Sequence, residues 1–275
     1  MRGRSQGGVA TMHGHRARKR FGQNFLADAH YIARIVDAVD PRPGDNIVEI
    51  GPGLAALTAH LVERAGFIHA VEIDRDLAAR LRERFAPAQL ALHEADALEF
   101  DVASLGRDLR VVGNLPYNIS SPLLFRIAEI AASVRDVHVM LQKEVVARMT
   151  APPGTSDYGR LTVMLQATFR IERLFVVPPG AFRPAPKVES AVARLTPLRE
   201  HAPAIADPAL FARVVGAAFM QRRKTLRNAL AGLADAPAFE AADIDPQRRG
   251  ETLSVGDFVR LTDAVRASPA VSTAR

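Results

Sequence analysis

The sequence predicts an α/β protein in which a parallel, doubly wound sheet is followed by a small all-helical domain. Between residues 29 and 141, short apolar strands alternate with helical patterns at the spacing typical of such sheets. After about residue 200 only helical patterns remain. A glycine-containing turn directly after the first of these strands adds a third indication, because open α/β sheets bind ligands at such turns.

The expected elements follow one another at short intervals. Apolar side chains recur at helical spacing over residues 29–39, and the pair Asp40-Pro41 ends that helix. Strands are then expected at residues 46–50, 67–73, 90–93, 111–112 and 137–141, and helices at 54–64, 76–85 and 123–130. Strands at 171–177 and 191–196 flank a proline-rich loop and are expected to form an antiparallel edge of the sheet. Helices at 208–220, 225–234 and 255–265 complete the chain.

The charge is unevenly distributed along the chain. The formal net charge is +6, and residues 1–20 carry six basic side chains and no acidic one, so the remainder is formally neutral. A second acid-free stretch, residues 208–234, contains Arg213, Arg222, Arg223, Lys224 and Arg227. Localised basic segments on a neutral body fit contacts to phosphates. A solvated tail and an ordinary exposed helix face are the alternative. We expect an arm of residues 1–17, an α/β domain of residues 18–200 and a helical domain of residues 201–275.

Composition excludes several classes of site. The chain has no cysteine, which rules out disulfides, thiolate nucleophiles and thiolate–zinc sites. His13 and His15 lie close together, but no further ligands surround them, so we expect no metal. No apolar run reaches the roughly 20 residues needed to cross a bilayer, and the basic N-terminus lacks the apolar segment of a signal peptide. We therefore expect a cytoplasmic protein without a membrane partner.

The tetrapeptide Asn114-Leu115-Pro116-Tyr117 leaves the end of a predicted buried strand. The Asn114 side-chain oxygen and the Leu115 carbonyl offer acceptors, Pro116 stiffens the corner, and Tyr117 offers a flat stacking surface. Such a site suits the exocyclic amine of adenine, whose lone pair is delocalised into the ring. The alternative is a turn that merely ends the strand, and the tetrapeptide alone does not decide between them.

Further polar residues follow neighbouring strands. Gly51 and Gly53 form a strand-to-helix turn in which a ligand can approach the backbone closely. Ala56 occupies the position at which the dinucleotide-binding motif requires its third glycine. This difference disfavours a nicotinamide-dependent oxidoreductase. Glu72 lies near the end of the second strand, where a carboxylate can accept both ribose hydroxyls. Asp96 can accept from an adenine amine or cap the next short helix.

Six segments together resemble one family. They are residues 18–26 (RKRFGQNFL), 48–53 (VEIGPG), 71–74 (VEID), 112–120 (VGNLPYNIS), 141–144 (LQKE) and 221–228 (QRRKTLRN). In this order they are similar to those of the small-subunit ribosomal RNA adenine dimethyltransferases. The resemblance covers roughly residues 16–265. It implies a Rossmann-like methyltransferase sheet with a helical RNA-binding domain, S-adenosyl-L-methionine as methyl donor, and dimethylation of N6 of two adjacent adenines near the 3′ end of 16S rRNA.

The resemblance also implies roles for single residues. Gln23, Asn24 and Leu26 form the first cofactor motif, which residue physics alone does not identify. Gly51 and Gly53 would lie against the methionine part, Glu72 would hold the ribose, Asp96 the adenine amine, and Asn114 would lie between cofactor and target. Tyr117 would stack on the flipped adenine. Phe182 is a second stacking candidate or, equally, an edge-strand core residue. Arg222, Arg223 and Lys224 would contact the RNA.

These assignments predict direct in-line transfer of a methyl group from sulfonium to N6, aided by alignment and by acceptors that strengthen as charge develops on nitrogen. The small-subunit RNA within the ribosomal subunit or its precursor would be the partner, and the enzyme would act as a monomer. Three alternatives remain: a 23S rRNA methyltransferase of the antibiotic-resistance type, a DNA adenine methyltransferase, and a ribosome-assembly factor in which binding matters more than methylation.

Overall fold

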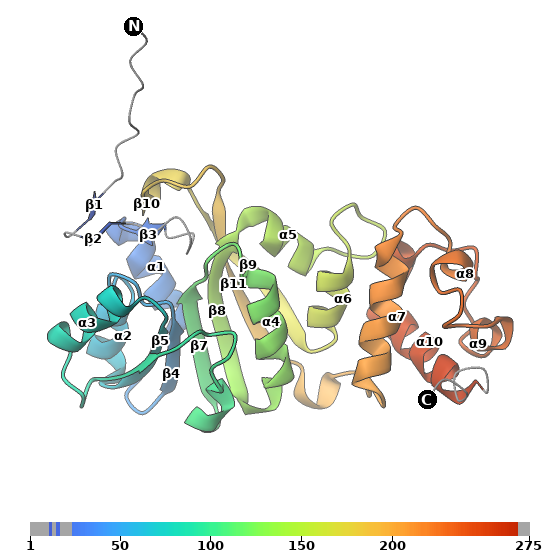
Figure 1. Ribbon diagram of the computed structural model, residues 1–275, viewed down its shortest axis with the longest axis horizontal. Coiled ribbons are helices and arrows are strands. Elements are labelled where there is room, and N and C mark those ends of the chain that lie inside the picture. The colour runs from blue at the N-terminus through green and yellow to red at the C-terminus, as the bar shows by residue number, and fades with distance from the viewer. Residues whose placement is uncertain (1–10, 13–14, 17–23, 269–275) are drawn as a thin grey trace, which may run out of the picture. The chain divides into compact units, whose positions relative to one another are not determined.

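The computed structural model describes residues 11–12, 15–16 and 24–268 (Figure 1). Gln23 and most of the expected basic arm lie outside the described residues. The chain divides into two compact units. The first unit comprises Met1–Lys143 and Arg173–Leu195, and the second comprises Glu144–Glu172 and Thr196–Arg275.

A seven-stranded sheet with the order β6-β5-β4-β7-β8-β11-β9 forms the centre of the first unit. Its strands are β4 (Asn46–Ile50), β5 (Ile68–Glu72), β6 (Leu90–Glu94), β7 (Leu109–Asn114), β8 (Val134–Gln142), β9 (Phe169–Val177) and β11 (Ser190–Pro197). The strands from β6 to β8 pair in parallel, and β11 pairs with β8 in antiparallel orientation. The predicted Rossmann-like α/β class and its antiparallel edge are confirmed, because the switch of strand order at β4 is that of a doubly wound sheet.

Helices and short ribbons connect these strands. The helices of the first unit are α1 (Ala29–Val39), α2 (Thr58–Ala65), α3 (Arg75–Arg84) and α4 (Ser120–Glu129), with the 3₁₀ turns η2 (Val102–Leu105), η3 (Ala131–Ser133) and η4 (Pro179–Ala181). Two-stranded ribbons join β1 (Thr11–Met12) to β2 (His15–Arg16) and β3 (Phe25–Leu26) to β10 (Phe182–Arg183). Asp28 and Asp74 cap α1 and α3 by accepting from backbone N–H groups. The helix α2 begins four residues later than expected, since the glycine turn extends through Ala55, which has a φ of 65°.

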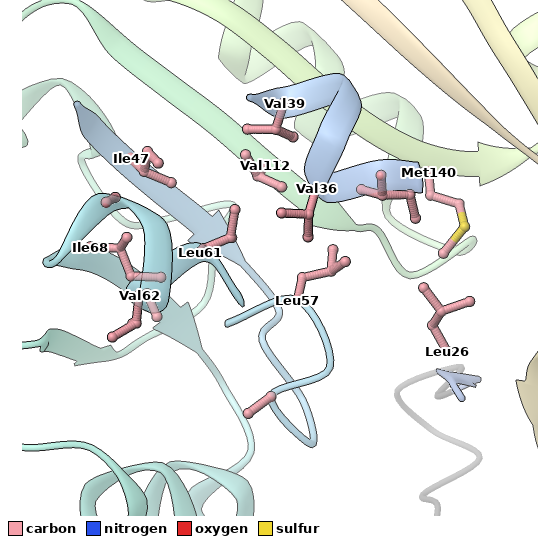
Figure 2. Packing of buried hydrophobic residues seen from close by; sticks show 14 of the residues in the cluster. Leu26, Val36, Val39, Ile47, Leu57, Leu61, Val62, Ile68, Val112 and Met140 are labelled. Carbon is pink, nitrogen blue, oxygen red and sulfur yellow. The ribbon is translucent and has the colours of Figure 1, made fainter. Parts of the chain in front are cut away.

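One face of the sheet packs against α1 and α2 (Figure 2). Val36 and Val39 of α1 and Leu61 of α2 are buried with Ile47 of β4 and Val112 of β7. Val48, the neighbour of Ile47, belongs to a separate cluster with Leu109, because successive side chains of a strand point to opposite faces. Because both faces of these strands are buried, their sequences are nearly continuous runs of apolar residues.

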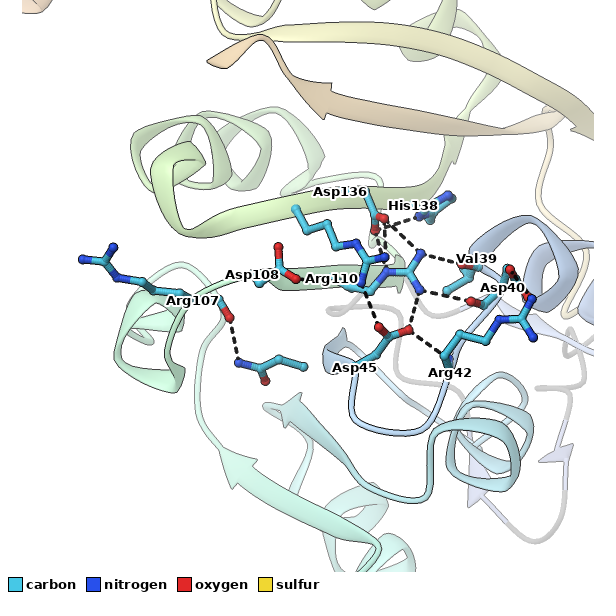
Figure 3. A network of polar contacts seen from close by, with 11 residues as sticks. Val39, Asp40, Arg42, Asp45, Arg107, Asp108, Arg110, Asp136 and His138 are labelled. Atoms are coloured by element: carbon cyan, nitrogen blue, oxygen red, sulfur yellow. Dashed lines mark hydrogen bonds and ion pairs between the residues drawn. The ribbon is translucent and has the colours of Figure 1, made fainter. Parts of the chain in front are cut away.

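A buried ion-pair network joins α1 to the edge where the parallel strands begin (Figure 3). The guanidinium of Arg110 lies 2.7 Å from Asp45 and 2.9 Å from Asp136, and it also donates to the carbonyls of Val39 and Asp40 at the end of α1. Burial alone would raise the pKa values of both aspartates, but hydrogen bonds and the charge of Arg110 hold them below their usual range. The network lies at the opposite ends of the strands from Asn114.

The second unit consists mainly of helices. They are α5 (Lys143–Thr150), α6 (Arg160–Gln166), α7 (Pro208–Met220), α8 (Leu226–Ala229), α9 (Ala236–Ala241) and α10 (Val255–Ala267), with η5 (Arg199–His201) and η6 (Gly250–Thr252). The unit boundary differs from the boundary expected at residue 200, because Tyr158 and Val163 are buried in one cluster with Val214 of α7 and Leu261 of α10. Residues 144–172 therefore belong with the C-terminal helices. The helix expected at 225–234 is shorter and gives way to turns.

No helix within the described ranges combines the length and the apolar character needed to cross a membrane.

Candidate active site

A pocket of about 290 Å³ lies in the first unit where the parallel strands end. Every proposed cofactor and catalytic residue that the structure describes lines it: Asn24, Leu26, Gly51, Gly53, Glu72, Asp96, Asn114, Leu115, Pro116 and Tyr117. These residues come from β3 and from the carboxyl ends of β4, β5, β6 and β7. Ligands of open α/β sheets bind at this edge, and the volume is close to the lower end of the usual range for small-molecule sites. The structure thus brings the predicted residues together, while Gln23 lies outside the described residues.

The glycine turn after β4 has a backbone that only glycine adopts easily. Gly51 and Gly53 have φ values of 69° and 57°. The N–H of Gly51 donates to the carbonyl of Val71 on β5, at 2.9 Å, which anchors the start of the turn to the sheet. The turn therefore presents its main chain to the pocket in a fixed conformation.

Glu72 holds the other end of this turn. Its buried carboxylate accepts from the N–H of Gly53 at 3.1 Å through Oε2 and from the N–H of Asp74 at 2.9 Å through Oε1. Burial raises the pKa of Glu72, although these backbone donors oppose the shift. Each carboxylate oxygen has a further lone pair, so Glu72 can accept additional hydroxyl donors while it braces the turn.

Glu49 is the last residue but one of β4, close to the glycine turn, but the carboxylate that accepts a hydrogen bond from the turn belongs to Glu72. Glu49 lines the pocket, and its buried Oε2 has no hydrogen-bond partner among the described residues. Burial raises the pKa of Glu49 to about 7. A buried acceptor without a donor fits a ligand that brings a cationic or hydrogen-bonding group of its own.

Asp96 accepts a capping hydrogen bond and also lines the pocket. Its Oδ1 accepts from the N–H of Leu98 at 2.9 Å, as a capping residue does. The residue also lines the pocket, beside the apolar side chains of Ile73 and Leu77. This combination of one carboxylate and an apolar wall suits the edge and the face of a purine ring.

The corner at Asn114 is fixed by three hydrogen bonds. The Nδ2 of Asn114 donates to the carbonyl of Asn24 at 3.0 Å, which directs the amide oxygen away from that carbonyl and leaves it as an acceptor. The N–H of Leu115 donates to the carbonyl of Met140 on β8, and the N–H of Ile119 donates to the carbonyl of Pro116. Hydrogen bonds on both sides thus keep the acceptors of the corner in place.

Tyr117 is half-buried and lines the pocket beside this corner. Its hydroxyl lies 2.7 Å from the Oγ of Ser190, and its carbonyl accepts from the hydroxyl of Ser120. Burial raises the pKa of Tyr117, which keeps the phenol neutral near pH 7. The ring is therefore an uncharged aromatic surface at the edge of the pocket.

Phe25 was missed by the sequence interpretation. Its side chain lines the pocket, and a Cβ built on Gly53 would lie 3.2 Å from its ring, so the ring covers the glycine turn. The signal was available, because Phe25 stands between Asn24 and Leu26 in the first cofactor motif. Spacing alone gave no reason to expect a residue so far upstream at the turn.

The structure corrects the assignment of Phe182 to the target base. The side chain is fully buried and belongs to the core cluster that contains Leu26 and Ala181. Phe182 pairs with Leu26 in the short ribbon between β10 and β3. Of the two interpretations that the sequence left open, the core residue is the one observed, because the ribbon turns this ring inward.

The three basic residues that follow α7 fall into two groups. Arg222 donates to Glu251 at 3.1 Å and to the carbonyls of Thr155 and Tyr158, so it ties a loop of the second unit to η6. Arg223 and Lys224 are exposed. The same acid-free run thus supplies three exposed cations, of which Arg222 also ties segments of the second unit together.

The comparison with protein families decides what kind of site this is. The family model described as "Ribosomal RNA adenine dimethylase" matches residues 14–266. The chain belongs to this family. The family resemblance stated from the six sequence segments is thereby confirmed, and the protein is an rRNA adenine dimethyltransferase.

Relatives of this adenine dimethylase are similar over nearly their whole length. "Ribosomal RNA small subunit methyltransferase A" of Aromatoleum aromaticum is 62% identical over 253 residues, which cover 92% of this chain and 96% of the relative. The protein of the same name from Thiobacillus denitrificans is 58% identical, covering 90% and 97%.

Two solved structures resemble this adenine dimethylase in fold. A dimethyladenosine transferase from Plasmodium falciparum has a TM-score of 0.75 at 24% identity, covering 86% of this chain and 95% of that chain. The 23S rRNA methyltransferase ErmE has a TM-score of 0.65 at 27% identity, covering 88% and 100%.

Proposed function

We propose that this adenine dimethylase uses S-adenosyl-L-methionine to dimethylate N6 of two adjacent adenines near the 3′ end of 16S rRNA in the small ribosomal subunit or its precursor. The observation that carries the proposal is the placement of Asn114, Glu72 and Asp96 in one pocket at successive strand ends. Identities of 62% and 58% to small-subunit methyltransferases favour this RNA over the 23S rRNA alternative. We further propose action as a monomer in the cytoplasm and a part in ribosome biogenesis.

The pocket fits the proposed methyl donor. Glu72 would hold the ribose hydroxyls, Asp96 the adenine amine, and the turn at Gly51 and Gly53 the methionine part. The unpartnered Oε2 of Glu49 suits the positive charge of the donor. When bound, S-adenosyl-L-methionine supplies a methyl group already activated on a sulfonium, so the reaction needs no metal and no covalent nucleophile.

The corner residues would prepare the target amine. In the first transfer the amide oxygen of Asn114 and the carbonyl of Leu115 would accept from the two N–H bonds of N6, and in the second one of them would accept from the N–H that remains, which draws the nitrogen lone pair out of the ring. Each transfer breaks the methyl–sulfonium bond, forms the N–CH3 bond and releases one N6 proton to solvent. These acceptors bind more strongly as positive charge develops on nitrogen, and this difference lowers the barrier. Tyr117 stacks on the base and holds it out of its own strand. Pro116 limits the motion of the corner.

The RNA would continue along the second unit. Arg223 and Lys224 are exposed, and together with the basic arm of residues 1–17 they supply positive charge for phosphates. We propose that residues 201–275 bind RNA, with the internal tie of Arg222 keeping this surface folded.

Incubation of the protein with labelled S-adenosyl-L-methionine and undermethylated small subunits, followed by mapping of modified nucleotides, tests the proposal. We expect label on two adjacent adenines of the 16S rRNA. The Asn114→Ala variant should bind donor and subunits but transfer almost no label. Label on 23S rRNA or on DNA instead would favour one of the other targets. Full rescue of subunit maturation by the inactive variant would assign the larger role to binding.

A further inference from the structure

Tyr117 is held at its outer end by a residue from a distant strand. Its hydroxyl lies 2.7 Å from the Oγ of Ser190, and either oxygen can donate the hydrogen. The two residues are 73 positions apart in the sequence. Ser190 is fully buried and does not line the pocket, so its contact with the reaction passes through the Tyr117 ring.

Ser190 occupies a rigid position. It is the first residue of β11 and lies opposite Gln142 of β8 in the antiparallel ladder. The preceding residue, Glu189, accepts from the N–H of Lys143 through its carbonyl at 2.9 Å and from the Lys143 ammonium through its carboxylate at 2.7 Å. The backbone ladder and this double contact fix the strand on either side of the serine. The hydroxyl of Ser190 is therefore a fixed point against which the tyrosine ring can be set.

The other end of Tyr117 is fixed as well. The hydroxyl of Ser120 donates to the Tyr117 carbonyl at 3.1 Å. With the backbone held there, the side chain could still rotate about its χ1 bond, and a hydrogen bond at the phenol oxygen, which lies on the χ2 axis, fixes the position of that oxygen and so removes the freedom about χ1. Because the ring is already held in place, it lies at the pocket before the base binds. Binding of the base therefore does not have to order this side chain.

We propose that Ser190 is a positioning residue for methyl transfer, which holds the Tyr117 ring in the place where it can stack on the target adenine. The inference rests on the proposed function, because it assumes that Tyr117 contacts the base. It adds a fifth strand, β11, to the four strands β4 to β7 whose ends provide the rest of the site. The serine acts only through the ring, and it has no contact with the donor.

Substitutions at Ser190 test the proposal. Ser190→Ala removes the hydroxyl, and Ser190→Cys keeps a similar volume but offers only a weak hydrogen bond. Both should lower kcat about three- to tenfold, the range expected for one hydrogen bond, with an unchanged Kd for S-adenosyl-L-methionine. Ser268→Ala is the matched control, since that serine makes a hydrogen bond of the same 2.7 Å length to Asp235 in the second unit. It should leave kcat unchanged.

A double-mutant cycle with Tyr117→Phe separates positioning from folding. Each single variant removes the same hydrogen bond, so Ser190→Ala combined with Tyr117→Phe should lose no more activity than either change alone. If the double variant instead shows the product of the two single losses of activity, the two hydroxyls act separately and the inference is overturned. Wild-type kcat in both Ser190→Ala and Ser190→Cys would overturn it as well.

Tyrosine emission gives a readout that does not depend on methyl transfer. The chain has three tyrosines and no tryptophan, so Tyr31→Phe with Tyr158→Phe leaves Tyr117 as the only emitter. In that background, Ser190→Ala should lower the time-resolved anisotropy of Tyr117 because the ring gains rotational freedom. Unchanged anisotropy would contradict the inference. If the wild-type protein methylates no RNA, the proposed function fails, while lower anisotropy would still support the anchoring of the ring by Ser190.

Discussion

The side-chain amide of Asn114 donates a hydrogen bond to the main-chain carbonyl of Asn24, 90 residues earlier in the chain, at 3.0 Å. The bond selects one orientation of the amide, with Nδ2 toward the N-terminal segment and Oδ1 left to accept. The segment that carries Asn24 also places Phe25 over the glycine turn. The first cofactor motif thus reaches the reacting corner directly.

Asn114→Asp tests the importance of this orientation. The substitution keeps an acceptor toward the target but places a carboxylate oxygen against the Asn24 carbonyl, so that two acceptors face each other. We expect methyl transfer to fall about a hundredfold, the usual effect of losing one preorganised hydrogen-bonding group. Single-turnover assays with undermethylated subunits measure it. If the aspartate variant keeps its activity while Asn114→Ala does not, acceptance alone is sufficient and the bond to Asn24 is dispensable.

Glu72→Gln should weaken binding of S-adenosyl-L-methionine about ten- to a hundredfold. Glutamine has one acceptor oxygen, whereas Glu72 accepts from Gly53 and Asp74 through two oxygens, and hydrogen bonds to a charged group contribute about 1.5–3 kcal/mol. Titration calorimetry measures the change. Glu94→Gln is the matched control, because Glu94 lies opposite Glu72 in the β5–β6 ladder but pairs with Arg82. Equal losses in the two variants would contradict a specific role for Glu72.

Substitutions in the basic run after α7 should affect thermal stability and RNA binding separately. Arg222→Ala removes the tie to Glu251, Thr155 and Tyr158 and should lower thermal stability. Replacing Arg223 and Lys224 together by alanine should leave stability unchanged. It should reduce the slope of log K against log salt by about 1.4, since each of the two contacts to single-stranded phosphate contributes about 0.7.

Filter binding of small subunits over a range of salt concentrations measures that slope. An unchanged slope in the double variant would assign these two residues to the solvated surface of the second unit.

Glu49 should make the protein less stable as the pH rises. Its folded pKa of about 7 exceeds the ordinary value of 4.5, so the folded state binds the extra proton between these values. The free energy of unfolding should therefore fall by about 3 kcal/mol from pH 4.5 to pH 7 relative to Glu49→Gln, at 1.36 kcal/mol per pH unit. Urea unfolding of both proteins across this range checks the prediction, and parallel curves would refute it.

Removal of Arg110 should destabilise the first unit strongly. Arg110→Met leaves Asp45 and Asp136 buried without their main partner, which costs about 3–5 kcal/mol near neutral pH. Arg135→Ala is the control, because that half-exposed arginine also pairs with Asp45 but should contribute less than about 1 kcal/mol. The pKa values of the two aspartates are lowered in the folded state, so the stability that their ionisation contributes is present above pH 3.8 and disappears in acid. Urea unfolding at pH 7 and pH 3 measures both effects.

The strand ends were predictable from the sequence because parallel topology carries every carboxyl end to one edge. This rule predicts that Glu72, Asp96 and Asn114 lie together at that edge of the sheet. Contacts set by side-chain direction were not predictable in this way. The covering of Gly53 by Phe25 and the bond between Tyr117 and Ser190 depend on how the ribbon and β11 close on the sheet, and sequence spacing does not encode either.

Exposure was the second quantity that residue types could not supply. The sequence left Phe182 open between a stacking role and a core position, and its ring is buried in the core. Arg222, which was expected to contact RNA, is exposed but also bonds within its own unit. The boundary near residue 200 followed a change of pattern, whereas the grouping of Tyr158 and Val163 with α7 depends on packing between segments far apart in the chain.

The interleaving of the two units has a consequence for biosynthesis. Residues 144–172 are synthesised before their core partners in α7 and α10. At that point β11 of the first unit has not been synthesised either. The apolar side chains of Tyr158 and Val163 must therefore stay uncovered by these helices until α7 has been added, roughly fifty residues later, which at roughly 5–20 residues per second takes seconds. The second unit can therefore complete its core only after α10 has been synthesised.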